Sequence, residues 1–189
     1  MKPLPVDFYA RDTAVVAREL LGKLLVRSLD EGDIVCRIVE TEAYYGADDP
    51  ASHAARGFTP RSSIMYGPPG KAYVYFSYGM HHLLNVVTEV EGTAGAVLIR
   101  ALEPLKGSGL MSSRRPCKQV TDLASGPAKL TQALGIGLTM NGADFTGPGI
   151  FVCEGAEAGD IVVSPRVGIS AGKEMLLRFS VRDNPYVSR

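Results

Sequence analysis

A glutamate and an arginine, each within an apolar stretch, are the side chains of this sequence best placed to do chemistry. Glu42 closes an alternating apolar stretch, and Arg100 lies inside the run AVLIRAL, on the same face of a strand as Leu98 and Leu102. Burying either charge is costly unless it is solvated, paired or used. Two interpretations stay open on these residues alone: a buried ion pair that fixes the strand register, or a catalytic carboxylate that a neighbouring guanidinium keeps ionised at neutral pH.

Aromatic side chains recur in the same part of the chain, which has no tryptophan. They are Tyr44, Tyr45, Tyr66, Tyr73, Tyr75, Phe76 and Tyr78. A single tyrosine is more often part of a core than a binding platform. A concentration of them beside a carboxylate and basic residues, however, fits a pocket that stacks on a base. On residue types alone, the pattern indicates a nucleotide or nucleic-acid enzyme and goes no further.

Other motifs fail when their spacing is tested. The segment GPPGK at positions 67–71 resembles a phosphate loop, but that motif needs glycine at 65 and serine or threonine at 72, where this chain has Met65 and Ala72. His81 and His82 have no carboxylate or cysteine at ligand spacing, and the three cysteines form no CxxC pair. The sequence therefore predicts no metal and no cofactor.

The composition describes a globular chain with balanced charge. Hydrophobic residues make up 46% of the 189 residues, which is enough for the core of one domain spanning 1–189, in a chain too short for two. The 20 basic and 20 acidic side chains cancel, so the overall charge offers no attraction to nucleic acid. No apolar run reaches the length of a membrane span, and no signal-peptide pattern opens the sequence. A cytoplasmic protein is expected, associated with the nucleoid if the source is bacterial.

The expected elements favour a single α+β domain. The spacing predicts a helix over 12–21, with Asp12 or Thr13 as its N-cap and Gly22 as its stop, and a second helix from Pro127 to Leu134. Long loops are expected at 46–70 and 106–121. Strands are expected at 23–29, 34–44, 71–78, 82–89, 94–102 (closed by Pro104), 150–154, 160–163 and 175–181. These lengths predict a compact domain on a curved, mostly antiparallel sheet with peripheral helices.

An ordered set of short motifs resembles the alkyladenine (3-methyladenine, or methylpurine) DNA glycosylase family. The set runs from about the first helix to the C-terminal NPYVS at 184–188, so a chance match is excluded. Its members are RIVETEAY at 37–44, Asp48-Asp49, Ala51-Ser52-His53, Thr59-Pro60-Arg61, YVY at 73–75, YGM at 78–80, Asn85, VLIRALEP at 97–104, SGPAKL at 125–130 and RVG at 166–168.

The resemblance implies a hydrolytic reaction on DNA. Glu42 would be the general base that deprotonates the attacking water, Arg100 would help hold that water and the carboxylate, and the backbone carbonyl of Val167 would help to position the same water. The activity implied is excision of alkylated or deaminated purines, such as 3-methyladenine, 7-methylguanine, hypoxanthine and ethenoadenine, from duplex DNA in base-excision repair. Because water is the nucleophile, the enzyme would be monofunctional, with no lyase step.

The resemblance also implies the base pocket and its surroundings. Tyr44 would stack on one face of the flipped base, and His53 and Tyr75 would lie against the other, with the His53 N–H at the base edge. Asn85, with Leu98 in the pocket wall, would exclude the 2-amino group of normal guanine, and Tyr78 would be the wedge that fills the gap in the duplex. Candidates for contact with the DNA backbone are Arg56, Arg61, Lys71, Arg114, Arg115 and Lys129.

The partner implied is double-stranded DNA that contains damaged purines, with no membrane, no obligate protein partner and a monomeric enzyme. The loop at 106–121 is shorter than in vertebrate-like members, and the segment 65–70 departs from the family pattern, which puts flanking contacts in doubt. Two other functions compete. One is a free-nucleoside hydrolase or phosphorylase, and the other is a non-catalytic nucleic-acid-binding module with a fold like the C-terminal domain of methionyl-tRNA formyltransferase.

Overall fold

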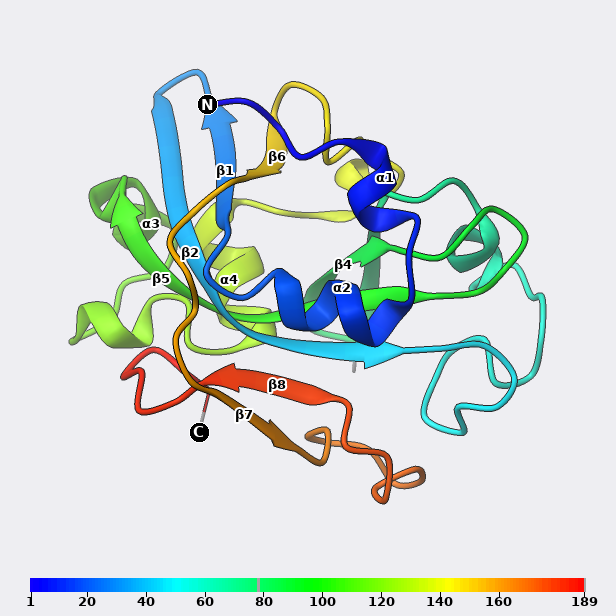
Figure 1. Ribbon diagram of the computed structural model, residues 1–189. Helices are drawn as coiled ribbons and strands as arrows, with labels where there is room; N and C mark the ends of the chain where they lie inside the picture. Colours follow the sequence, from blue (N-terminus) through cyan, green and yellow to red (C-terminus); the bar gives the residue numbers. More distant parts are fainter. Residues whose placement is uncertain (78, 189) are drawn as a thin grey trace.

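A single curled antiparallel sheet forms the body of the protein (Figure 1). The computed structural model describes residues 1–77 and 79–188. In these residues the strand order is β3-β4-β5-β2-β1-β6, with β8 also paired to β2 and β7 paired to β8. The strands are β1 (Leu24–Leu29), β2 (Gly32–Tyr44), β3 (Ala72–Ser77), β4 (His81–Val87), β5 (Ala96–Lys106), β6 (Ile150–Cys153), β7 (Ile161–Ser164) and β8 (Arg178–Val181). The expected α+β class, on a curved antiparallel sheet, is confirmed.

Short helices surround this sheet. They are α1 (Val6–Tyr9), α2 (Thr13–Glu19), α3 (Ser108–Arg114) and α4 (Pro127–Leu134), with 3-10 turns η1 (Ser63–Tyr66), η2 (Val120–Asp122) and η3 (Leu138–Met140). The side chain of Asp12 accepts a hydrogen bond from the Val15 N–H at 3.0 Å, so Asp12 is the N-cap of α2. Gly22, at φ 83°, follows the end of that helix, and Pro127 opens α4. No helix of the described chain is both long and apolar enough to cross a membrane.

Strand β2 is central to the sheet, and its two faces have different environments. One edge of its 13 residues pairs with β5, and the other pairs first with β1 and then with β8. On one face Thr41 donates a hydrogen bond to the Ala17 carbonyl of α2 at 2.7 Å. On the other face Cys36 contacts Met111 of α3. That second face then continues, two residues at a time, to Glu40, Glu42 and Tyr44.

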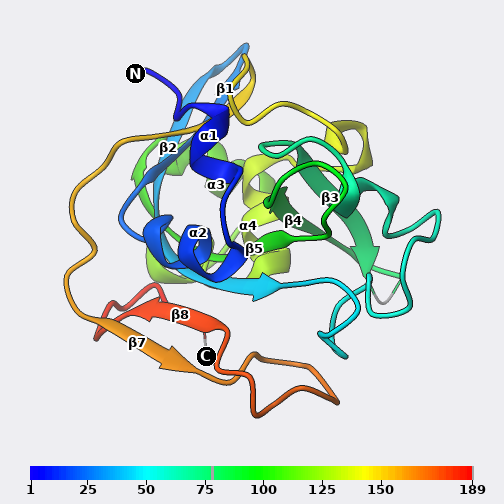
Figure 2. The same cartoon turned by 45° about the vertical axis from the view of Figure 1, so that its right-hand side comes forward.

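The helices cover both faces of the sheet but leave part of one face open. Helix α2 packs on β2 and β5, whereas α4 packs on β4 and β5 from the opposite side (Figures 1 and 2). Leu20 and Leu130 are fully buried in the shared core, and Thr131 fastens α4 to β4 through a 2.7 Å hydrogen bond to the His82 carbonyl. The uncovered part of the face lies beyond the first turn of α4, over the ends of β2 and β5.

Two expectations about the middle of the chain were wrong. The stretch 106–121 is not only loop, because it contains α3 and η2. Helix α3 has no side-chain cap, and the burial of Met111 against the sheet stabilises it instead. Strand β5 also continues past Pro104 to Lys106. A register irregularity between Val35 and Cys36 falls opposite Pro104, and such irregularities are where a sheet accommodates the missing N–H of proline.

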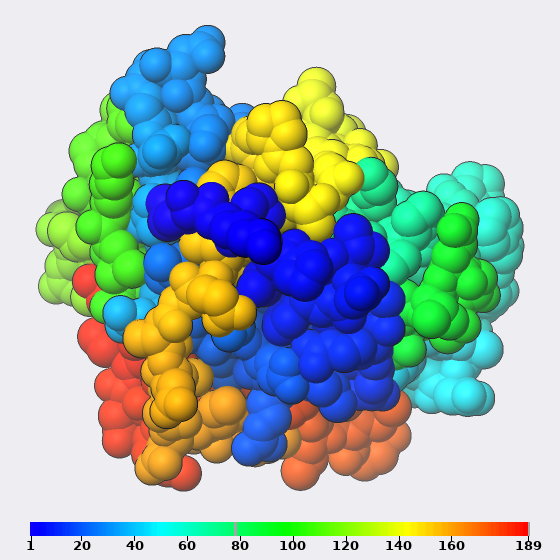
Figure 3. Space-filling model, turned by 45° about the horizontal axis from the view of Figure 1, so that its top comes forward, coloured from blue at the N-terminus to red at the C-terminus, as the bar shows by residue number. Residues whose placement is uncertain are grey.

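The connection between β6 and β7 crosses the surface beside the N-terminal helices. Figure 3 shows this orange segment lying against the blue N-terminal region. A side chain at position 22 would collide with the Ala156 carbonyl. This close approach is a second reason for glycine at this position, besides its place at the end of α2. Through this connection the β7–β8 hairpin reaches the second half of β2, next to Glu40 and Glu42.

Candidate active site

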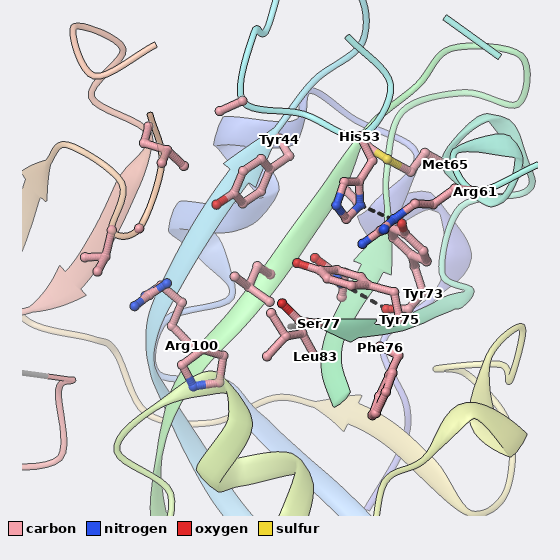
Figure 4. A pocket seen from close by; sticks show the side chains of 18 of the residues that line it. Tyr44, His53, Arg61, Met65, Tyr73, Tyr75, Phe76, Ser77, Leu83 and Arg100 are labelled. Carbon is pink, nitrogen blue, oxygen red and sulfur yellow. Dashed lines mark hydrogen bonds between the residues drawn. The ribbon is translucent and has the colours of Figure 1, made fainter. Parts of the chain in front are cut away.

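A cavity of about 610 Å³ opens where β2, β3, β4 and β5 meet the long loop at 46–70 (Figure 4). Its size lies within the range of small-molecule sites, and its wall combines aromatic rings with a few polar groups. The sequence-predicted residues that line it are Tyr44, His53, Arg61, Tyr75, Asn85, Leu98, Arg100 and Val167. The structure therefore brings residues from four strands and two loops to one place.

Glu42 lies directly behind the wall of this cavity. Its side chain is 0% exposed, and it accepts three hydrogen bonds: from Arg100 Nη1 at 3.1 Å, from the Tyr44 hydroxyl at 2.8 Å and from the Val167 N–H at 2.7 Å. All three donors line the cavity, whereas Glu42 itself does not. An ionised carboxylate has about four lone-pair sites, so about one acceptor site of Glu42 stays free. This N–H contact is separate from the predicted role of Val167, in which its carbonyl positions the attacking water.

Arg100 joins Glu42 to a second buried glutamate. Its Nε donates to Glu40 Oε1 at 3.1 Å, and Glu40 is also 0% exposed. Glu40 further accepts from Arg178 Nε at 2.6 Å and from the N–H and hydroxyl of Ser188 at 2.7 and 2.9 Å. Alternation along β2 had placed Glu40 on this face, but nothing local in the sequence pointed to Arg178 or Ser188.

A buried ion pair between Asp49 and Arg166 supports Tyr44 and Val167. The pair is bidentate, at 2.6 and 2.7 Å, and both side chains are 0% exposed. The Arg166 guanidinium also donates to the Ala43 carbonyl at 2.9 Å and lies 4.6 Å from the centroid of the Tyr44 ring. One side chain thus fixes the start of the 46–70 loop, the end of β2 and the residue before Val167. Both residues stood in the matching motifs, yet no role had been predicted for them.

Burial keeps the Tyr44 hydroxyl protonated. Desolvation, with the Glu42 charge as a further cause, raises the pKa of Tyr44 well above its ordinary value. The phenol is therefore a hydrogen-bond donor at any physiological pH, and Glu42 is its acceptor. This contact fixes the plane of the Tyr44 ring that lines the cavity.

The opposite wall is built from His53 and the tyrosines of β3. His53 lies edge-on to Tyr75, with 4.5 Å between ring centroids and an interplanar angle of 80°, and its Nδ1 is 2.7 Å from the Tyr73 hydroxyl (Figure 4). Burial, and then the charge of Arg61, lowers the pKa of His53 to about 4. The imidazole is therefore neutral at neutral pH. Arg61 lies 5.2 Å from the Tyr75 ring centroid.

Asn85 and Leu98 form the floor between these walls. They are register partners on β4 and β5, and each is 3% exposed. Asn85 donates a 3.0 Å hydrogen bond from Nδ2 to the carbonyl of Tyr73, its partner on β3. This bond fixes the orientation of the amide, so that the Asn85 side chain is a rigid part of the cavity.

Four of the other basic residues predicted from the sequence have partners within the protein. Lys71 pairs with Asp144 at 3.0 Å, Lys129 with Asp122 at 3.2 Å and Arg114 with Glu31 at 3.3 Å. Arg115 donates to the Asp122 carbonyl, and Arg56 is exposed. Because Glu31 precedes β2 and Tyr44 ends it, Arg114 lies at the end of β2 opposite the cavity. Tyr78, the predicted wedge, lies outside the described residues.

The comparisons with known proteins identify the class of enzyme to which this site belongs. The family model for methylpurine-DNA glycosylase matches residues 7–185. A protein of Carboxydothermus hydrogenoformans is 52% identical, over 98% of this chain and 98% of its own, and one of Methanocella arvoryzae is 49% identical, over 100% and 97%. Both are named, provisionally, as 3-methyladenine DNA glycosylases. The chain is a DNA glycosylase. It belongs to the methylpurine-DNA glycosylase family, as the resemblance predicted.

Proposed function

We propose that this glycosylase takes an alkylated or deaminated purine out of duplex DNA into the aromatic cavity and hydrolyses its N-glycosidic bond with a water activated by Glu42. The observation that carries the proposal is the position of Glu42. It is a fully buried carboxylate with about one free acceptor site, and every group that donates a hydrogen bond to it lines the cavity. An ordinary structural ion pair has no need of such a cavity beside it.

In the proposed bond cleavage, Glu42 accepts the proton and Arg100 positions the reacting groups. Water attacks C1′ of the sugar and transfers a proton to Glu42, while the electrons of the C1′–N bond leave with the base. The transition state is oxocarbenium-like, so the negative charge of Glu42 also stabilises the positive sugar. Arg100 donates a hydrogen bond to the carboxylate and, with the Val167 carbonyl, would hold the attacking water in line.

The cavity favours damaged purines through stacking and charge. Tyr44 would stack on one face of the base, with His53 and Tyr75 against the other. Tyrosine faces attract the positive charge of an alkylated purine, and a neutral His53 adds no repulsion. Flipping costs a few kcal/mol and costs least for a damaged or mispaired base, which adds selectivity. Asn85, held by the Tyr73 carbonyl, would leave no room for the 2-amino group of guanine.

The proposed reaction stops at the abasic site. A lyase step needs an amine that forms a Schiff base with the sugar, and the described residues lining the cavity include no lysine. Water is the nucleophile instead. The enzyme would act as a monomer, with Tyr78 as the wedge in the duplex and Arg61, beside the cavity, as the nearest of the predicted contacts to the DNA backbone.

The experiment measures base release from a short synthetic duplex that carries one hypoxanthine or ethenoadenine, without added metal. The expected products are the free base and an uncut strand with an abasic site, and borohydride added during the reaction should trap no protein on the DNA. A covalently trapped protein would contradict the water mechanism. No release from this duplex or from methylated DNA, together with binding to tRNA, would support the binding-module alternative instead.

A further inference from the structure

Glu40 has a hydrogen-bonding environment unlike that of Glu42. Within the described residues, its Oε1 accepts from Arg100, Arg178 and the Ser188 hydroxyl, and its Oε2 accepts from the Ser188 N–H. Oε1 therefore receives three donors, more than its roughly two lone pairs, whereas Oε2 receives one. Of these donors only Arg100 lines the cavity, so Glu40 is linked to the site through that guanidinium alone.

Arg100 is held by both of its neighbours on β2. Its Nε is bonded to Glu40 and its Nη1 to Glu42, so the guanidinium plane is fixed at two points. Nη2 lies 3.5 Å from the Ser188 hydroxyl, which adds a weaker third contact. With 7% exposure, Arg100 keeps a small part of its surface at the cavity. Without Glu40, only the bond to Glu42 would restrain its long side chain.

We propose that Glu40 is a positioning residue for the reaction: with Ser188, it holds the Arg100 guanidinium in the orientation in which that guanidinium bonds Glu42. Glu40 touches neither the base nor the water. It acts through Arg100, and Arg178 balances its charge from β8. The proposal rests on the function proposed above for Glu42 and Arg100.

The kinetic test compares Glu40→Gln with a matched control on the same two strands. Glu103 on β5 pairs with Arg37 on β2 at 3.0 Å and has no bond to Arg100, so Glu103→Gln makes the same chemical change outside the network. Under single-turnover conditions, Glu40→Gln should slow base release by about tenfold to a hundredfold. Affinity for the damaged duplex should stay within about threefold. Glu103→Gln should change neither quantity. A wild-type rate in Glu40→Gln would overturn the proposal, and so would equal losses of rate and affinity.

A second measurement does not depend on activity. The Nε–Hε resonance of Arg100 can be identified in a ¹⁵N–¹H spectrum by its loss in Arg100→Lys. It should shift and broaden in Glu40→Gln but not in Glu103→Gln, and an unchanged resonance would overturn the proposal. If Glu40→Gln does not fold, Ser188→Ala replaces it as the test variant. It should change the Arg100 resonance and the rate in the same direction but by less, and no change in either would contradict the proposal. If the wild type releases no base, the proposed function fails, while the spectrum still decides whether Glu40 holds Arg100.

Discussion

At the scale of single residues, chemistry here depends on which donors each carboxylate receives. Glu40 and Glu42 stand two residues apart on one strand, and both are fully buried. Glu40 receives four donors, of which only Arg100 lines the cavity, whereas Glu42 receives three, all from the cavity wall. We therefore propose Glu42 as the base and Glu40 as a supporting residue, although alternation alone places both on the same face.

The partly buried, neutral His53 makes the stability of the protein depend on pH. Its pKa is about 4 in the folded protein and 6.5 in the unfolded reference. Between these values the unfolded chain binds a proton that the folded protein does not, so the free energy of unfolding falls as the pH falls. Urea denaturation at about pH 7 and about pH 5 should show a larger loss for the wild type than for His53→Gln. Equal losses in both proteins would contradict a neutral, buried imidazole.

At the scale of elements, local signals explain what the sequence predicts well. The cap chemistry of α2, the alternation of β2 and the proline that opens α4 each lie within a few residues of the element they define. Helix α3 has no such signal, and its stability comes from burying Met111 in a site formed by distant strands. The prediction that β5 ends before Pro104 was wrong, because the proline is accommodated by a register irregularity on β2. The sequence around Pro104 gives no sign of that irregularity.

Within the candidate site, too, some residues can be found from local sequence and others only from the fold. Glu42 and Arg100 could be found because each is a charge in an apolar strand. The pair Asp49–Arg166 spans 117 residues, and the contact of Glu40 with Ser188 spans 148, so only the folded chain brings these partners together. Sequence spacing therefore predicts the groups that react more readily than the groups that hold them.

The N-cap of α2 provides the prediction at this scale. Asp12 accepts from the Val15 N–H at 3.0 Å and from the Tyr45 hydroxyl at 2.9 Å. Asp12→Ala should lower the free energy of unfolding by about 1 kcal/mol, because it leaves helix donors without a partner. Asp7→Ala, in α1, is the matched control, since Asp7 is exposed and caps no helix. Urea denaturation measures both, and equal stability of Asp12→Ala and the wild type would exclude the cap.

At the scale of the whole molecule, the balance of charge limits how the protein can bind DNA. Basic and acidic residues are equal in number, at 20 each. Lys71, Arg114 and Lys129 are also paired with acidic side chains. Non-specific affinity comes from neutralised phosphates, so few counterions should be released on binding. Recognition then depends more on the cavity than on a broad positive surface.

The balanced charge predicts a shallow salt dependence for binding to undamaged DNA. The logarithm of the association constant should fall against the logarithm of salt concentration with a slope no steeper than about −4, which corresponds to about four phosphate contacts. Fluorescence anisotropy with an undamaged duplex between about 50 and 200 mM salt measures the slope. A slope near −8 would show that the paired basic residues release their partners and bind phosphates.

The role of Glu42 is the central claim, and one comparison tests it most directly. Glu42→Gln keeps the shape of the side chain but removes its charge and its ability to accept a proton. Release of ethenoadenine or hypoxanthine from a duplex should be slower than in the wild type by about a hundredfold or more. Binding to the same duplex should be preserved, because the aromatic walls are unchanged. Excision by Glu42→Gln at the wild-type rate would contradict the assignment of Glu42 as the base.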